Sequence, residues 1–199
     1  MRLHHQPRTR STRVLWMLEE TGAPFDLTVM NREDKATPAY RKLHPLGRVP
    51  VIEEEGGPVF ESVAILLHLA DLHPEAGLIG GLGTHERALH YQWALFATSE
   101  VDAALGDIAR QLWSDGDPDE AIVAAARGRF ATATAVVEDA LGDGSFLVGD
   151  RFSVADLAVG AVLGFARMAE LAELTPGLAS YVDALEARPA RQRAVAVTA

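Results

Sequence analysis

Pro50 stands at the head of a short apolar run, and its position limits how residues 44–64 can fold. A proline cannot donate a hydrogen bond to a strand ladder, so it fits the first residue of a strand and not its middle. The Val-Ile-Glu-Glu run that follows is therefore predicted to be a strand. Residues 56–58, Gly-Gly-Pro, are typical of a tight turn into a second strand at residues 59 and 60. The stretch predicts an antiparallel hairpin.

Ser62 follows this hairpin and precedes an apolar pattern typical of a buried helix. Apolar residues occupy positions 63, 65, 66, 67 and 69. Serine is a favoured N-cap, so we expect Ser62 to cap this helix. The first N–H groups of a helix have no partner within it and attract carboxylates. The pair Glu61-Ser62 is therefore a candidate site for an anionic ligand.

The first 43 residues alternate between strand and helix patterns. They predict a strand at residues 1–5, a polar loop at 6–10, and a helix from Ser11 or Thr12 to a C-cap at Gly22. A second strand at residues 25–30, a polar loop and a short helix at residues 38–43 follow. A strand-helix-strand order needs a crossover connection and so at least one parallel strand pair. The order predicts a thioredoxin-like α/β domain over residues 1–75.

Residues 76–83 are rich in glycine and are predicted to be a linker. Residues 84–199 carry helical patterns throughout and predict an all-α helical bundle. Its helices are expected at residues 84–111, from an N-cap at Asp117 to residue 141, from a Ser-x-x-Asp capping box at Ser153 to residue 168, and from Thr175 to a stop before residue 188. The predicted fold class is thus an α/β domain followed by an all-α domain.

Composition excludes several classes of function. The chain of 199 residues contains no cysteine, which excludes disulfides, thiolate metal sites and a protein cysteine nucleophile. Its seven histidines show no metal-ligand spacing, so no metal is expected. A formal net charge of −10 disfavours nucleic acid as a partner. With no signal-peptide pattern and no apolar run of about 18 residues, we expect a cytoplasmic protein that does not span a membrane.

Arginines crowd the beginning of this acidic chain. They stand at positions 2, 8, 10 and 13, and the first acidic residue after them is Glu19. A local positive site of this kind attracts an anionic ligand. The alternative is that these arginines are solvated surface charges.

These motifs, in this order and spacing, resemble the cytosolic glutathione transferases. The run Gly-Arg-Val-Pro-Val-Ile followed by Glu-Ser-x-Ala-Ile resembles the glutathione-binding half of that family. Residues 13–25 resemble its first helix, and residues 149–157 resemble a segment of its second half. The resemblance spans nearly the whole chain. It implies the glutathione transferase fold, glutathione as a co-substrate, and a homodimer.

The resemblance also implies which residues bind glutathione. Val49, next to Arg48, would pair its backbone with the cysteinyl part across a cis bond to Pro50. Glu61 and Ser62 would hold the γ-glutamyl end. From the residues alone, a hairpin and a capped helix without any ligand remain the alternative.

Catalysis in this family requires a group that stabilises the thiolate. The family places a tyrosine at the end of the first strand, or a serine or cysteine in the loop before the first helix. Here the first tyrosine is Tyr40, and the usual serine position falls near Arg8. The remaining candidate donors in this loop are Thr9, Arg10 and Ser11.

The predicted function is that of a glutathione S-transferase-like enzyme, which activates glutathione as a thiolate for attack on a small hydrophobic electrophile, as in detoxification. Two alternatives remain open. One is a non-catalytic binding or regulatory protein of the same fold, and the other is a purely structural dimer module.

Overall fold

The computed structural model describes residues 1–197, which form two compact units. The first unit contains Met1–Ile79 together with residues 187–197, and the second contains Gly80–Glu186. The chain thus leaves the first unit once and returns to it. The domain boundaries expected from the sequence, at residues 75 and 84, remain a prediction.

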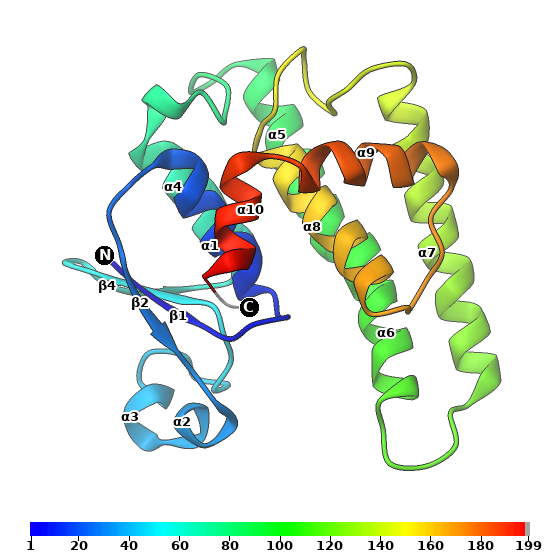
Figure 1. Cartoon of the computed structure of the whole chain (residues 1–199), viewed down its shortest axis with the longest axis horizontal. Helices are drawn as coiled ribbons and strands as arrows, with labels where there is room; N and C mark the ends of the chain where they lie inside the picture. The colour runs from blue at the N-terminus through cyan, green and yellow to red at the C-terminus, as the bar shows by residue number, and fades with distance from the viewer. Residues whose placement is uncertain (198–199) are drawn as a thin grey trace. The chain divides into compact units, whose positions relative to one another are not determined.

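The first unit is built around a four-stranded mixed sheet (Figure 1). Its strands are β1 (Arg2–His5), β2 (Asp26–Val29), β3 (Val51–Glu54) and β4 (Gly57–Phe60). They lie in the order β2-β1-β3-β4, with β1 parallel to β2 and antiparallel to β3, and β3 antiparallel to β4. The structure therefore confirms the parallel pair and the hairpin. The turn, predicted at residues 56–58, lies instead at residues 55 and 56, and Pro58 belongs to β4, where a proline is tolerated because β4 is an edge strand.

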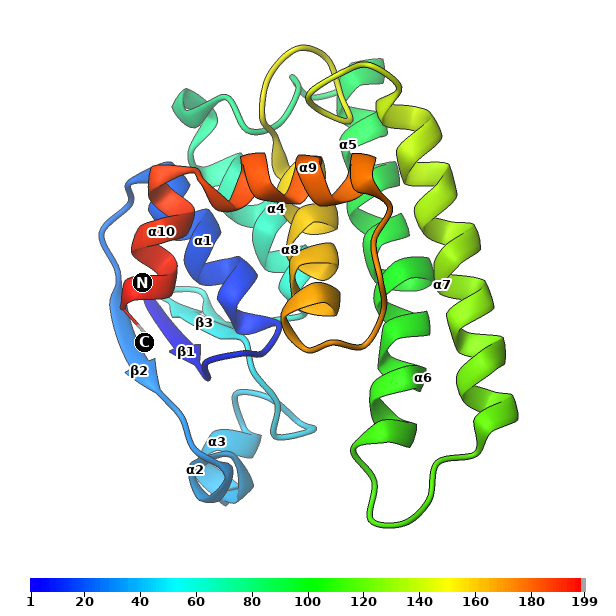
Figure 2. The same ribbon diagram turned by 45° about the vertical axis from the view of Figure 1, so that its right-hand side comes forward.

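Helices cover both sides of this sheet. They are α1 (Ser11–Thr21), α2 (Arg32–Ala36), α3 (Pro38–Arg41), α4 (Ser62–Leu72), the 3-10 helix η1 (Pro74–Ala76) and α10 (Pro189–Ala196). In Figures 1 and 2, α1, α4 and α10 lie on one side of the strands, and α2 and α3 lie on the other. Fully buried apolar side chains from the strands and from α1 and α4 form the core, among them Leu3, Leu15, Ile52, Ile65 and Leu66. Removal of this apolar surface from water is the main force that holds the unit together.

The segment between β2 and α3 was predicted to be a polar loop. This prediction is wrong, because the segment contains helix α2. Asn31 and Asp34 form a reciprocal capping box: the Asn31 side chain accepts from the Asp34 N–H at 2.8 Å, and Asp34 accepts from the Asn31 N–H at 2.9 Å. The box gives hydrogen-bond partners to two backbone N–H groups that would otherwise be unpaired at the start of α2, and so stabilises a helix of only five residues. The end of α1 agrees with the sequence, since Gly22 has a φ of 67° and its N–H donates to the Leu18 carbonyl.

Helix α10 was not predicted from the sequence, and charged groups hold it against α1. The Arg188 guanidinium donates to both carboxylate oxygens of Glu20, at 2.7 and 2.9 Å, while Glu20 also accepts from the indole N–H of Trp16 at 2.8 Å. Arg193 donates to the carboxylate of Glu19 at 2.6 Å. These contacts, between residues far apart in sequence, fasten α10 to the first unit.

The second unit contains helices joined by loops, and its described residues form no strand, as predicted. Its helices are α5 (His85–Phe96), the π-helix η2 (Ala97–Asp102), α6 (Ala103–Leu112), α7 (Glu120–Leu141), α8 (Val154–Met168) and α9 (Pro176–Glu186). The helix expected over residues 84–111 is therefore interrupted by a π segment. The Ser153–Asp156 capping box is present, and the Tyr181 hydroxyl donates to Asp156 at 2.8 Å.

The predicted N-cap of α7 is corrected by two residues. Asp119, not Asp117, accepts from the N–H groups of Ala121 and Ile122, at 2.9 and 3.2 Å. Pro118 therefore lies before the helix and not in its first turn.

In the part of the chain that the structure describes, every helix is too short or too polar to cross a lipid bilayer.

We expect Arg188→Ala to lower the free energy of unfolding by about 1.5–3 kcal/mol, because it removes a two-pronged, charge-assisted hydrogen bond from a largely buried carboxylate. The matched control is Arg151→Ala, which breaks an exposed pair with Glu86 and should change stability by about 1 kcal/mol or less. Urea denaturation followed by circular dichroism measures both. Equal losses in the two variants would contradict the role assigned to Arg188.

Candidate functional site

Strand register brings the three segments singled out in the sequence to one end of the sheet. His4 of β1 pairs with Val51 of β3, and Val51 pairs with Phe60 of β4. Because β3 runs antiparallel to both neighbours, it begins where β1 and β4 end. The loop after β1, the Val49-Pro50 bond before β3 and the Glu61-Ser62 pair after β4 therefore meet at this end.

The loop after β1 is organised around the hydroxyl of Ser11. This oxygen lies 2.8 Å from Nδ1 of His5, 2.8 Å from the Thr9 hydroxyl and 2.9 Å from the Gln6 carbonyl, and it accepts from the Gln6 N–H at 3.0 Å. Ser11 and His5 have no exposed surface. Burial lowers the pKa of His5, so its imidazole is neutral at physiological pH. The Ser11 hydroxyl is therefore a structural centre of the loop.

The two other predicted thiol-activating residues lie in the same turn but are more accessible. Thr9 is half-buried, and its hydroxyl donates to the Gln6 carbonyl at 2.7 Å and accepts from the Ser11 N–H at 3.3 Å. Arg10 is exposed and is the N-cap residue of α1, without a side-chain capping bond. Thr9 and Arg10 thus stand directly before α1, one with a half-buried hydroxyl and the other with an exposed side chain.

The start of α4 differs from the expected cap. Glu61, not Ser62, is the N-cap residue, with φ 75° and ψ 111°, and its side chain caps no N–H of the helix. A positive φ is unusual for a residue other than glycine, and such strain concentrates at functional sites. Ser62 is the first helical residue and is buried, while Glu61 is exposed. The first N–H groups of α4 therefore lack a side-chain acceptor.

Arg13 links α1 to the start of α4. Its guanidinium is buried and donates to the Ser62 hydroxyl at 3.5 Å, the outer limit of a hydrogen bond. Because Arg13 supplies the hydrogen for this contact, the Ser62 hydroxyl hydrogen is free to donate elsewhere. In the sequence analysis Arg13 was treated only as one of four basic residues near the beginning of the chain. Its position on the apolar face of the α1 pattern could have indicated a buried arginine.

The segment before β3 is held from both sides. The Tyr40 hydroxyl donates to the Arg48 carbonyl at 2.8 Å, and the Val49-Pro50 peptide bond is cis. Gly47 has a φ of 60°, and a side chain there would come within 2.6 Å of the Lys35 carbonyl oxygen. The turn thus requires glycine. In the sequence analysis Tyr40 appeared only as a tyrosine too far along the chain to activate the thiol. No local sequence pattern indicated its contact with Arg48.

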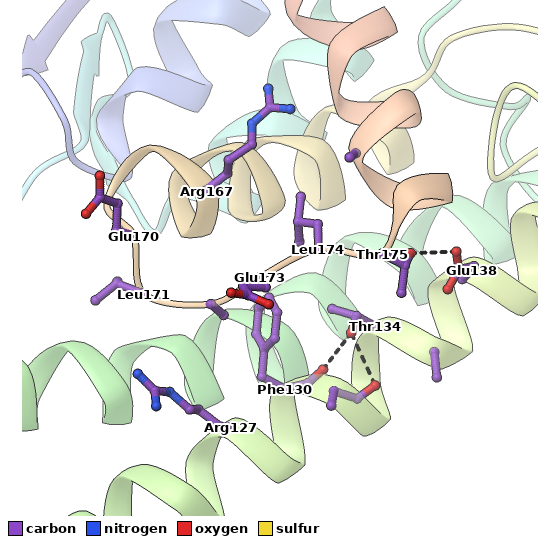
Figure 3. A pocket seen from close by; sticks show the side chains of 14 residues that line it. Arg127, Phe130, Thr134, Glu138, Arg167, Glu170, Leu171, Glu173, Leu174 and Thr175 are labelled. Atoms are coloured by element: carbon purple, nitrogen blue, oxygen red, sulfur yellow. Dashed lines mark hydrogen bonds between the residues drawn. The ribbon is translucent and has the colours of Figure 1, made fainter.

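A separate hollow of about 880 Å³ lies within the second unit, beside α7 and the connection from α8 to α9 (Figure 3). Its lining includes the buried side chains of Phe130 and Leu171 and charged groups of both signs, namely Arg127, Glu138, Arg167, Glu170 and Glu173. Its hydroxyl groups bond to the protein: Thr134 donates to the Phe130 carbonyl at 2.9 Å, and Thr175 donates to Glu138 at 2.6 Å. This mixture of apolar and oppositely charged side chains indicates no particular class of ligand.

Within residues 1–197, no three His, Cys, Asp or Glu side chains are grouped as a metal site.

Two protein-family models match the chain. The glutathione S-transferase N-terminal domain matches residues 9–72, and the glutathione S-transferase C-terminal domain matches residues 120–192. Among curated proteins, glutathione S-transferase 3 of Schizosaccharomyces pombe is 40% identical over 46% of this chain and 40% of its own length. Elongation factor 1-gamma of Trypanosoma cruzi is 36% identical over 64% of this chain and 30% of its own. The chain thus spans less than half the length of these two relatives.

Solved structures match over the whole chain. A glutathione transferase from Methylococcus capsulatus is 32% identical, with a TM-score of 0.88, over 99% of this chain and 98% of its own. A sphingomonad glutathione S-transferase, solved in complex with glutathione, is 28% identical, with a TM-score of 0.85, over 100% and 98%. The resemblance of the motifs and the predicted fold class are both confirmed, and the chain belongs to the cytosolic glutathione S-transferase family.

Proposed function

We propose that this protein is a glutathione transferase that binds glutathione at the end of the sheet and activates its thiol for attack on a small hydrophobic electrophile. One observation carries the proposal: strand register brings the loop before α1, Val49-Pro50 and Glu61-Ser62 to the same end of the sheet. A tripeptide in extended conformation spans about 10 Å. One such ligand can therefore contact all three segments together.

The start of α4 is proposed to hold the γ-glutamyl end of the ligand. Ser62 can donate its hydroxyl hydrogen to the α-carboxylate, because the hydroxyl oxygen already accepts from Arg13. The first N–H groups of α4 add donors, and the buried Arg13 adds a positive charge. Glu61 is exposed and can accept from the ligand's ammonium group. The pair thus complements a zwitterionic amino-acid head.

Val49 and its neighbours are proposed to bind the cysteinyl part. Arg48, Val49 and Pro50 lie directly before β3, and an extended peptide can pair with the backbone groups of Val49 as a further strand. The Arg48 side chain is exposed at the same turn and adds a positive charge. With both ends of the cysteinyl unit held, its thiol is directed toward the loop before α1.

Thr9, Arg10 and Ser11 are the proposed thiol-activating residues. A free thiol has a pKa of ~8.5, and lowering it by two units requires about 2.7 kcal/mol of preferential stabilisation of the thiolate. A hydroxyl, a guanidinium and the N-terminus of α1 together can supply this. The thiol proton passes to solvent, the thiolate sulfur forms a bond to the electrophilic carbon, and the leaving group departs with its bonding electrons.

We also propose that the protein acts as a cytoplasmic homodimer in detoxification.

A second candidate function is a non-catalytic binding or regulatory protein. It is favoured by the Ser11 hydroxyl, which is fully buried and surrounded by protein partners, and by relatives whose names describe an elongation factor and not a transferase. Two assays separate the candidates. Retention on immobilised glutathione supports both, whereas turnover of an aryl halide with glutathione supports only the enzyme. Binding without turnover at any accessible pH would select the second candidate.

We expect Ser62→Ala to weaken glutathione binding about ten- to a hundredfold, because it removes a hydrogen bond to a charged carboxylate worth ~1.5–3 kcal/mol. Isothermal titration calorimetry measures the dissociation constant. The matched control is Ser180→Ala in α9, which removes an exposed hydroxyl bonded to the Pro176 carbonyl and should leave affinity unchanged. An unchanged affinity of the Ser62 variant would remove Ser62 from the site.

The loop variants Thr9→Val, Arg10→Ala and Ser11→Ala should leave binding largely intact but raise the apparent pKa of the bound thiol, which slows turnover at neutral pH. The pH dependence of the rate with an aryl halide measures this. Thr132→Val on the exposed side of α7 is the control for Thr9→Val and should keep the parent profile. If all three loop variants also keep it, the backbone N–H groups of α1 are the activating donors.

A further inference from the structure

Tyr40 is fixed in place by its own backbone. It lies in α3 and is 4% exposed. Its N–H donates to the Thr37 hydroxyl at 3.2 Å, and its carbonyl accepts from the N–H groups of Leu43 and His44, at 2.8 and 3.0 Å. The phenol side chain therefore starts from a rigid point.

The ring of Tyr40 is also packed tightly. It forms a buried apolar cluster with Met30 and Val51, against which Val49 packs. On another side its ring centroid lies 5.4 Å from that of His4, in an edge-on arrangement. These contacts involve the ring alone, so they would persist without the hydroxyl.

The hydroxyl determines the orientation of one peptide group. It donates to the Arg48 carbonyl at 2.8 Å, and the Arg48-Val49 peptide is trans. In a planar trans peptide the C=O and N–H bonds point in opposite directions. Holding the Arg48 carbonyl toward Tyr40 therefore directs the Val49 N–H away from it. Among residues 1–197, no protein acceptor receives this N–H.

The hydroxyl keeps its hydrogen over the whole physiological pH range. Burial, with a smaller effect of the Glu53 charge, raises the pKa of Tyr40 to about 12. His4, whose ring lies edge-on to that of Tyr40, has its Nε2 2.6 Å from the Glu53 carboxylate. Tyr40 is therefore a permanent donor to Arg48.

We propose that Tyr40 is a positioning residue, which presents the Val49 N–H to the peptide backbone of the thiol ligand and so controls affinity without taking part in thiol activation. This inference rests on the proposed function, because the ligand is the glutathione-type tripeptide assigned to the site. It adds a residue that makes no contact with the ligand. Its effect should appear in binding and not in the reactivity of the bound thiol.

The test is Tyr40→Phe, which keeps the ring and removes only the hydroxyl. We expect its dissociation constant for S-methylglutathione, a ligand without a free thiol, to rise about three- to tenfold by calorimetry. With glutathione and an aryl halide, KM for glutathione should rise by the same factor, while kcat and the pH–rate midpoint stay at parent values. Equal affinity of parent and variant, or a shifted midpoint, would overturn the inference.

The matched control is Tyr181→Phe, which removes a buried phenol hydroxyl that donates to Asp156 in the second unit. It should lower thermal stability but leave the affinity for S-methylglutathione unchanged. If both variants lose affinity equally, the effect is a general loss of stability and the inference fails.

A second measurement uses the parent protein alone. In a titration of 15N-labelled protein with S-methylglutathione, the Val49 amide signal should shift as the site fills, and it should already be displaced in unliganded Tyr40→Phe. Binding without a Val49 shift would overturn the inference and leave the proposed function standing. If the parent does not bind S-methylglutathione at all, the proposed function falls, and the inference falls with it.

Discussion

The antiparallel pairing of β3 with β1 on one side and β4 on the other is the constraint on which the site depends. Side chains alternate along a strand, so a slip of one residue would exchange the faces of Val51 and Ile52, both of which are fully buried, and would disrupt the packing on both sides of the sheet. The core therefore selects one register. That register also determines which backbone atoms stand at the end of the sheet, so apolar burial and the geometry of the polar site have one cause.

Local chemistry made much of this fold predictable. Pro50 indicated where β3 begins, Gly22 adopts the left-handed conformation that ends α1, and the Ser153–Asp156 box opens α8. In each case the physical reason acts within a few residues, so the sequence shows it directly. The predicted binding residues follow the same logic, since they flank a hairpin that Pro50 and the Gly-Gly-Pro run indicated, although its turn lies slightly earlier than predicted.

Other features depend on contacts that no short stretch contains. Helix α10 has little apolar character of its own, and it is stabilised by glutamates of α1 that lie far away in sequence. The buried state of Ser11 results from the arrangement of His5 and Gln6 around it. β4 ends at Phe60 and α4 begins at Ser62, so Glu61 alone connects them, with a φ of 75°. A serine before an apolar run gave no sign of this geometry.

The return of α10 to the first unit has a consequence for how the chain folds. Arg188 is separated from its partner Glu20 by 168 residues. On a ribosome, the sheet and α1 emerge long before α10 is synthesised, so for that interval Trp16 and two glutamates of α1 face solvent without their arginines. The amino-terminal part is therefore an incomplete folding unit during translation. It becomes complete only after the intervening helices have been made, which couples the maturation of the sheet to the synthesis of the chain as far as α10.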